Sequence, residues 1–79
     1  MKTLNEKQFR AAVREFAADT SSANQYRPLL ESEHNRRVSQ QFEDYQYTPE
    51  FMFLSEIFSP VPDLVLRARY RKTVLETRA

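Results

Sequence analysis

The stretch DLVLRARYRKTVLETRA, residues 63–79, decides the fold class of this chain. It fits a strand, in which apolar and charged residues alternate, and also a helix with Leu66, Tyr70 and Val74 on one face. The helix is favoured because no other segment offers a strand to pair with, and a lone strand leaves its backbone groups unpaired. We therefore predict a helix capped by Asp63, with a strand as the alternative.

The composition supports a helical chain and removes several classes of function. The sequence has 79 residues and contains neither glycine nor cysteine. Without glycine there is no P-loop and no dinucleotide-binding fingerprint, and without cysteine there is no disulfide and no thiolate metal site. We expect one all-α domain over residues 1–79, and no cofactor.

Three further helices are predicted upstream, over residues 4–18, 25–45 and 49–58. The first follows a capping box that begins at Thr3, and the third follows Thr48 with a proline at its first position. The apolar stripe of the second is expected to contain Leu30, His34, Val38, Phe42 and Tyr45, with its charged residues, among them Glu33 and Arg37, on the other face. The expected fold is a small bundle of about four helices, two long ones in an antiparallel hairpin and two shorter ones.

The segment YQYTPEFMF, residues 45–53, gathers aromatic residues and a methionine around the start of the third helix. A core this small cannot bury all of them, and exposed apolar clusters usually mark interfaces. We interpret the cluster as a protein-binding patch. Its candidate contact residues are Tyr45, Tyr47, Phe51, Met52 and Phe53.

The charges of the chain are unevenly distributed. Residues 38–63 contain five acids and no Lys or Arg, whereas residues 64–79 contain five cations and one acid. The basic helix can pair with the acidic segment of its own chain or of a second copy, or it can contact nucleic-acid phosphates. In a helix, Arg67 and Arg71 share one face while Arg69 and Lys72 share another, which weakens the nucleic-acid interpretation. The candidate residues here are Arg67, Arg69, Tyr70, Arg71 and Lys72.

The single histidine, His34, does not define a catalytic site. It is predicted to be hydrogen-bonded and partly buried. Glu31 and His34 form a Glu-x-x-His pair of the kind used in di-iron bundles, but one pair alone is incomplete and would need a dimer. A helix-turn-helix is disfavoured by the acids near the start of the second helix and by the missing turn glycine.

The sequence therefore predicts a non-enzymatic protein–protein interaction module, an adaptor, regulatory subunit or inhibitor of a larger complex. The N-terminus lacks the apolar region of a signal peptide, and no apolar run in the sequence is long enough to span a membrane. The expected location is therefore the cytoplasm. The partner is expected to be a protein, with a homodimer as one option. The alternative is a nucleic-acid-binding regulator that uses the C-terminal arginine cluster.

Overall fold

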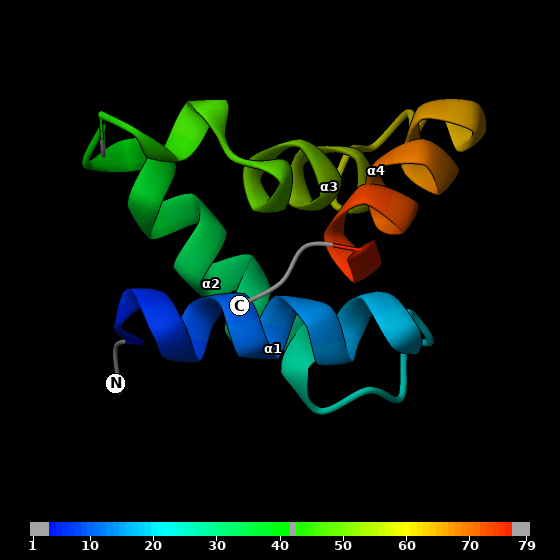
Figure 1. The fold of residues 1–79 in the computed structure, drawn as a ribbon, viewed down its shortest axis with the longest axis horizontal. Coiled ribbons are helices and arrows are strands. Elements are labelled where there is room, and N and C mark those ends of the chain that lie inside the picture. The colour runs from blue at the N-terminus through cyan, green and yellow to red at the C-terminus, as the bar shows by residue number, and fades with distance from the viewer. Residues whose placement is uncertain (1–3, 42, 77–79) are drawn as a thin grey trace.

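The computed structural model describes residues 4–41 and 43–76 (Figure 1). Within these residues the regular elements are all helical: α1 (Glu6–Ala18), α2 (Tyr26–Ser39), a short 3-10 turn η1 (Tyr45–Tyr47), α3 (Pro49–Ile57) and α4 (Leu64–Glu76). The all-α prediction is confirmed, and the alternative of a C-terminal strand is not. α4 is as long as α1, so only α3 is short.

The start of α1 is fixed by a capping box two residues later than predicted. The Gln8 backbone amide donates to Asn5 Oδ1 at 2.8 Å, and the Asn5 amide donates to Gln8 Oε1 at 3.1 Å. This reciprocal pair satisfies two amides that helical bonding leaves free. Thr3, the residue predicted to cap the helix, lies outside the described residues.

α2 ends at Ser39, six residues before its predicted end. Gln41 has a φ of 53°, which is the left-handed region and cannot continue a right-handed helix. The chain therefore turns, and Tyr45 returns toward the side of α2 instead of extending its stripe. Val38 is exposed, contrary to prediction, and Phe42 lies outside the described residues.

The buried face of α2 also differs from the prediction. It consists of Leu30, Glu33, His34 and Arg37, so two residues assigned to the polar side are buried. The spacing i, i+3, i+4, i+7 is that of one helix face. The charged members can be buried because they pair with each other and with α1, an arrangement that residue types alone did not reveal.

The two later helices begin as predicted. The Phe51 amide donates to Thr48 Oγ1 at 3.2 Å, and Pro49 occupies the first turn of α3. At α4, the amides of Val65 and Leu66 donate to Asp63 Oδ1 at 3.0 and 3.1 Å. An acceptor side chain at this position satisfies the free amides of a first turn.

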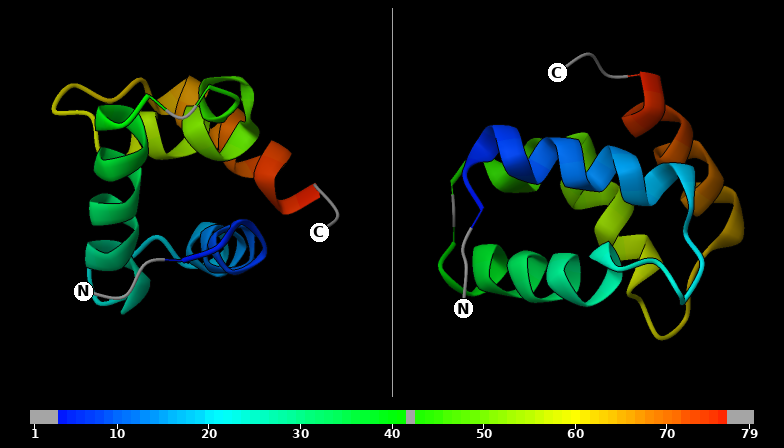
Figure 2. Two further views of the ribbon diagram at one scale, coloured as in Figure 1. Left: turned by 90° about the vertical axis from the view of Figure 1, so that its left-hand side faces the viewer. Right: turned by 90° about the horizontal axis from the view of Figure 1, so that it is seen from below.

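The core lies between α1 and the α3–α4 pair, with α2 closing one side (Figures 1 and 2). α3 packs against α4 and α2, and α1 packs against α2 and α4. α2 runs back toward the start of α1 while tilting away from it (Figure 2). The buried apolar residues are Phe9, Ala12, Val13, Phe16, Ala17, Leu30, Tyr45, Phe53, Leu54, Ile57 and Val74.

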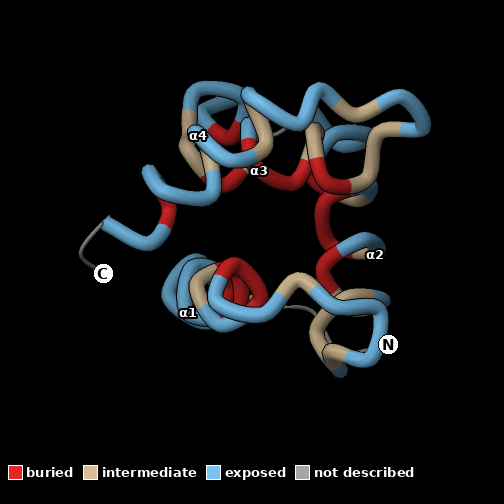
Figure 3. Tube along the Cα trace, turned by 90° about the vertical axis from the view of Figure 1, so that its right-hand side faces the viewer, coloured by how far each residue is buried: buried red, intermediate tan, exposed pale blue. Residues whose placement is uncertain are grey.

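Each helix contributes to this core, but α4 contributes least. Val74 is its only fully buried residue among those described, while Tyr70 packs against the core from a partly buried position. Figure 3 shows this exposure along most of α4. In the ranges 4–41 and 43–76, no helix has both the length and the apolar character that crossing a lipid bilayer requires.

Candidate interaction surface

The aromatic cluster of residues 45–53 is divided by the fold. Phe53 has no exposed surface and Tyr45 is buried, so both belong to the core and not to an outward-facing patch. Phe51 is partly buried and contacts the rings of Tyr45 and His34. Only Tyr47, 74% exposed, and Met52, 39% exposed, present substantial surface to solvent. The patch predicted from sequence is therefore reduced to two exposed side chains.

The basic cluster of α4 is also divided, in the way that helical spacing predicts. Arg71 is exposed, but its guanidinium reaches α1, where its Nε donates to the carbonyl of Ala17 at 2.6 Å. That carbonyl belongs to the last turn of α1, where a cation stabilises both the free acceptor and the negative helix end. Arg67 is partly buried, with an Nε that is fully enclosed. Arg69 and Lys72 point outward and are exposed.

Apolar residues share the outward side of α4 with these two cations. Residues 64, 65, 68, 69, 72, 75 and 76 fall within one half of the helix circumference, opposite the inward residues 66, 70 and 74. We call this half the α4 outer face; its members are Leu64, Val65, Ala68, Arg69, Lys72, Leu75 and Glu76, all of them exposed.

The apolar part of the α4 outer face is large for a chain of this size. Leu64 is 69% exposed and Val65 is 70% exposed, and the preceding Val61 is 85% exposed. Sequence analysis did not select these residues. The signal was present, however: once 66, 70 and 74 are assigned to the core, the remaining apolar residues of α4 must point outward.

The predicted pairing of the basic helix with the acidic segment is only partly realised. α3 and α4 pack closely, and Glu56 Oε2 accepts a hydrogen bond from the Asp63 amide at 3.1 Å. Among the described residues, however, no cation of α4 forms an ion pair with an acid of α3, and the one ion pair within α4 joins Lys72 to Glu76 at 4.0 Å. Both of its side chains are exposed, so the pair contributes little.

His34 is buried and hydrogen-bonded, as predicted. Its Nδ1 shares a hydrogen bond of 2.6 Å with the Tyr45 hydroxyl. The rings of Tyr45, Phe51 and Phe58 surround it with centroid distances of 5.7, 5.8 and 6.3 Å. Burial lowers the pKa of His34 and raises that of Tyr45. The pair joins α2 to η1 and is part of the core.

The Glu-x-x-His pair does not converge on a metal. Glu31 is exposed, while His34 is directed into the core toward Tyr45. Within the part of the chain that the structure describes, no group of three or more His, Cys, Asp or Glu side chains is arranged to hold a metal ion.

An ionic network beside His34 connects α2 to α1. Arg37 Nη1 donates to Glu6 Oε1 at 2.5 Å, its Nη2 donates to the Leu4 carbonyl at 3.3 Å, and its guanidinium lies 4.0 Å from the centre of the Phe9 ring. Glu33 is 3.6 Å from Arg37 and 3.0 Å from Arg36. Arg37 thereby links α2 to the start of α1 across the side where the two helices diverge.

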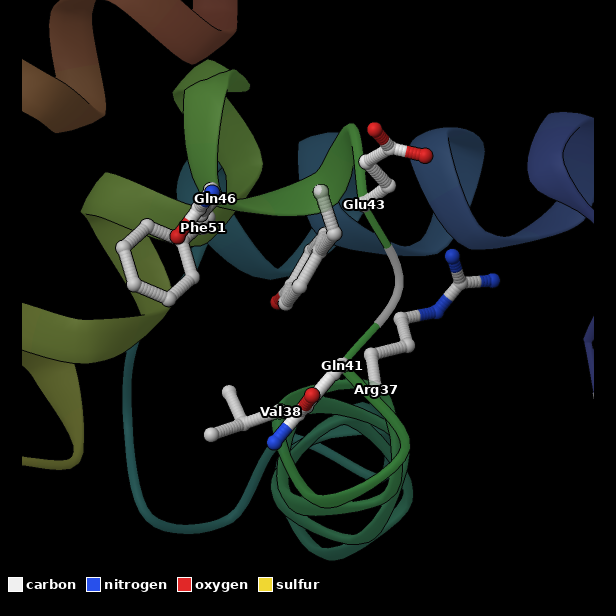
Figure 4. A pocket seen from close by; sticks show the side chains of 7 residues that line it. Arg37, Val38, Gln41, Glu43, Gln46 and Phe51 are labelled. Atoms are coloured by element: carbon white, nitrogen blue, oxygen red, sulfur yellow. The ribbon is translucent and has the colours of Figure 1, made fainter.

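A depression on the surface adjoins this network (Figure 4). It has a volume of about 570 Å³ and is lined by Arg37, Val38, Gln41, Glu43, Tyr45, Gln46 and Phe51. Of the three ionisable groups that line it, two already have partners: Arg37 bonds to Glu6, and the Tyr45 hydroxyl bonds to His34. The third, Glu43, is a single exposed acid. The depression therefore supplies no convergent set of uncommitted charged groups.

Comparison of the chain with protein-family models, with curated proteins and with solved structures finds no match. The function is therefore argued from the geometry of this chain.

The division of the α4 cations predicts different roles for two neighbouring arginines. Arg71→Met removes the hydrogen bond to the Ala17 carbonyl, and we expect it to lower the free energy of unfolding by about 1–2 kcal/mol. Arg69→Met removes an exposed cation, and we expect a change below about 0.5 kcal/mol. Urea denaturation of both variants measures the difference, and equal effects would contradict a stabilising hydrogen bond from Arg71 to the Ala17 carbonyl.

Stability should depend on pH through His34. Because burial holds the pKa of folded His34 below its usual value of 6.5, the unfolded chain binds the proton more readily. This contribution to stability is present above pH 6.5 and is lost as the pH falls through the folded pKa. Burial also raises the pKa of Glu50, which opposes the loss, since protonating Glu50 favours the folded chain.

Denaturation of the wild type and of His34→Gln between pH 7.5 and 5 separates the two groups. The variant keeps the Glu50 contribution and lacks the His34 contribution, so its stability should decline less on acidification. Parallel pH curves for the two proteins would contradict a neutral, buried His34.

Proposed function

We propose that this chain is a small, non-enzymatic protein-interaction module of the cytoplasm, an adaptor, regulatory subunit or inhibitor of a larger complex. It docks on a protein partner through the α4 outer face. The observation that carries the proposal is the exposure of Leu64 and Val65, each about 70%, on a helix whose core contacts are made by its other side. Exposed apolar residues grouped on one helix face are typical of helix-docking surfaces.

The nucleic-acid alternative has less support. Arg71 is exposed but hydrogen-bonded to α1, and the Arg67 Nε is enclosed, which leaves Arg69 and Lys72 as the exposed cations of α4 that are not held against α1. Phosphate binding scales with the number of cations that reach the backbone, and two are few. Apolar side chains between them add nothing to phosphate recognition.

Tyr47 and Met52 remain a second exposed apolar pair, but they carry less of the proposal. Their neighbours in the sequence, Tyr45 and Phe53, are fixed in the core and cannot join them at an interface. We therefore place the principal docking surface on α4 and not on the aromatic segment.

A quantitative pull-down with matched variants tests the proposed function. The wild-type chain, the double variant Leu64→Asp/Val65→Asp and the control Val38→Asp are immobilised and exposed to extract of the source cells. Val38 is also an exposed apolar residue, but it lies on α2. We expect a partner that is retained by the wild type and the control and lost by the double variant.

Two outcomes would overturn the proposal. One is a retained set of proteins that is the same for all three chains. The other is a partner lost with Val38→Asp but kept by the double variant. Circular dichroism of each variant shows that a loss of binding does not reflect unfolding.

A further inference from the structure

The charge of α4 restricts what can cover its outer face. The whole helix, Leu64 to Glu76, has four cations and one acid, a net charge of 4 − 1 = +3, and its outer face carries Arg69, Lys72 and Glu76, a net charge of 2 − 1 = +1. Arg69 and Lys72 lie among the apolar residues of the outer face, so any occupant of this face meets them directly. Since Arg69 has no ion-pair partner among the described residues, a partner can provide one.

A second copy is a poor occupant of this face. Pairing α4 with α4 across a two-fold axis would set Arg69 and Lys72 of one copy against the same cations of the other. Like charges placed against each other at an interface are destabilising. Docking α4 onto a different surface of a second copy gives a head-to-tail contact, which propagates into a ring or an open filament.

The size of the face suits a single helix. α4 has 13 residues and is therefore about 20 Å long, which matches three to four turns of a partner helix. Leu64 and Leu75 lie near the two ends of the face, and the small side chain of Ala68 lies between them. A small residue in the middle lets another helix approach closely, while the end residues supply apolar contacts.

We infer that the α4 outer face, if it docks as proposed above, receives an acidic amphipathic helix. The occupant would lay an apolar stripe along Leu64, Val65, Ala68 and Leu75 and place Asp or Glu beside Arg69 and Lys72. This inference rests on the proposed function and adds the chemistry of the partner. A face of this extent gives a small interface, so binding should be weak and reversible.

Designed peptides test the charge and the stripe separately. Three fluorescent 15-residue helical peptides are titrated against the full chain by anisotropy. One has a leucine stripe flanked by Glu, one has the same stripe flanked by Lys, and one keeps the Glu residues but has Ser in the stripe. We expect the first to bind about tenfold more tightly than the second, as two exposed ion pairs predict. The third should not bind.

Charge reversal supplies the decisive control. In the variant Arg69→Glu/Lys72→Glu the preference should invert, so that the Lys-flanked peptide binds more tightly. In Leu64→Ser/Val65→Ser all binding should weaken, and in Val38→Ser nothing should change.

The outcomes separate failure of this inference from failure of the proposed function. Equal binding of the Glu- and Lys-flanked peptides, lost in Leu64→Ser/Val65→Ser, would overturn the acidic partner and leave the docking face in place. Binding unaffected by Leu64→Ser/Val65→Ser, or no binding of any peptide, would overturn the inference itself. A dimer of the chain that dissociates in Leu64→Ser/Val65→Ser would replace the acidic helix with a second copy.

Discussion

Phe53→Ala is expected to lower the free energy of unfolding by about 3–5 kcal/mol. Phe53 has no exposed surface, and its ring lies 6.0 Å from the ring of Phe16 on α1 within the buried core. Truncation leaves a cavity that neighbouring side chains fill only in part. Chains of this length have a total stability of about 4–12 kcal/mol, so the loss would be a large part of it.

Met52→Ala is the matched control for Phe53→Ala. Met52 precedes Phe53 on α3 but is 39% exposed, so its truncation should lower stability by less than about 1 kcal/mol. Urea denaturation followed by circular dichroism compares the two variants. The interpretation of Phe53 as a contact residue predicts the opposite, since removing a partner-facing ring would leave the isolated chain intact.

Arg37→Ala is the second substitution with a large expected effect, about 3 kcal/mol. It removes the contacts of Arg37 to Glu6 and the Leu4 carbonyl and its stacking on Phe9, and it leaves Glu33 buried with less compensating charge. Removing one partner of a buried ionic group exposes the other to the full desolvation penalty. Arg37→Lys should recover only part of the loss. A lysine ammonium cannot donate the paired hydrogen bonds of a planar guanidinium, and it cannot stack on the Phe9 ring in the same way.

Arg36→Ala provides the control for Arg37. Arg36 also pairs with Glu33, at 3.0 Å, and donates to Gln40, but its side chain is partly exposed. We expect a loss of about 1 kcal/mol or less. A loss for Arg36→Ala equal to or greater than that for Arg37→Ala would contradict the role of Arg37 as the link between α1 and α2.

The sequence predicted those features that depend on local chemistry. Thr48 and Pro49 mark the start of α3, and Asp63 marks the start of α4, because an acceptor side chain before an apolar run satisfies a first turn directly. The opposed faces of Arg69 and Arg71 follow from helical spacing alone. The burial of His34 follows from its position on the stripe that contains Leu30.

The features that the sequence did not predict depend on contacts between distant residues. Gln41 carries no turn signal, yet its left-handed backbone ends α2 and sends Tyr45 back to His34. The sequence pattern assigns Glu33 and Arg37 to a solvated face, but the fold brings Glu6 and Phe9 against Arg37. Phe53 and Met52 are both apolar and adjacent, and only tertiary packing, in which Phe53 meets Phe16 of α1, decides which of them is buried.

The exposure of apolar residues on the α4 outer face also depends on tertiary packing and was not predicted from the sequence. The apolar residues Leu64 and Val65 at the start of a helix suggest burial, yet the core is filled by the side of α4 that carries Tyr70 and Val74. The available apolar residues exceed what the core of this chain can take from α4. The surplus is what a partner can cover.

Amide chemical-shift mapping of the labelled chain, titrated with the partner that the wild type retains, tests the docking surface most directly. The account predicts that the perturbed amides cluster at Leu64, Val65, Ala68, Arg69, Lys72 and Leu75, with Tyr47 and Met52 unchanged. Perturbations centred on Tyr47 and Met52 with α4 unchanged would contradict it and return the docking site to the aromatic segment.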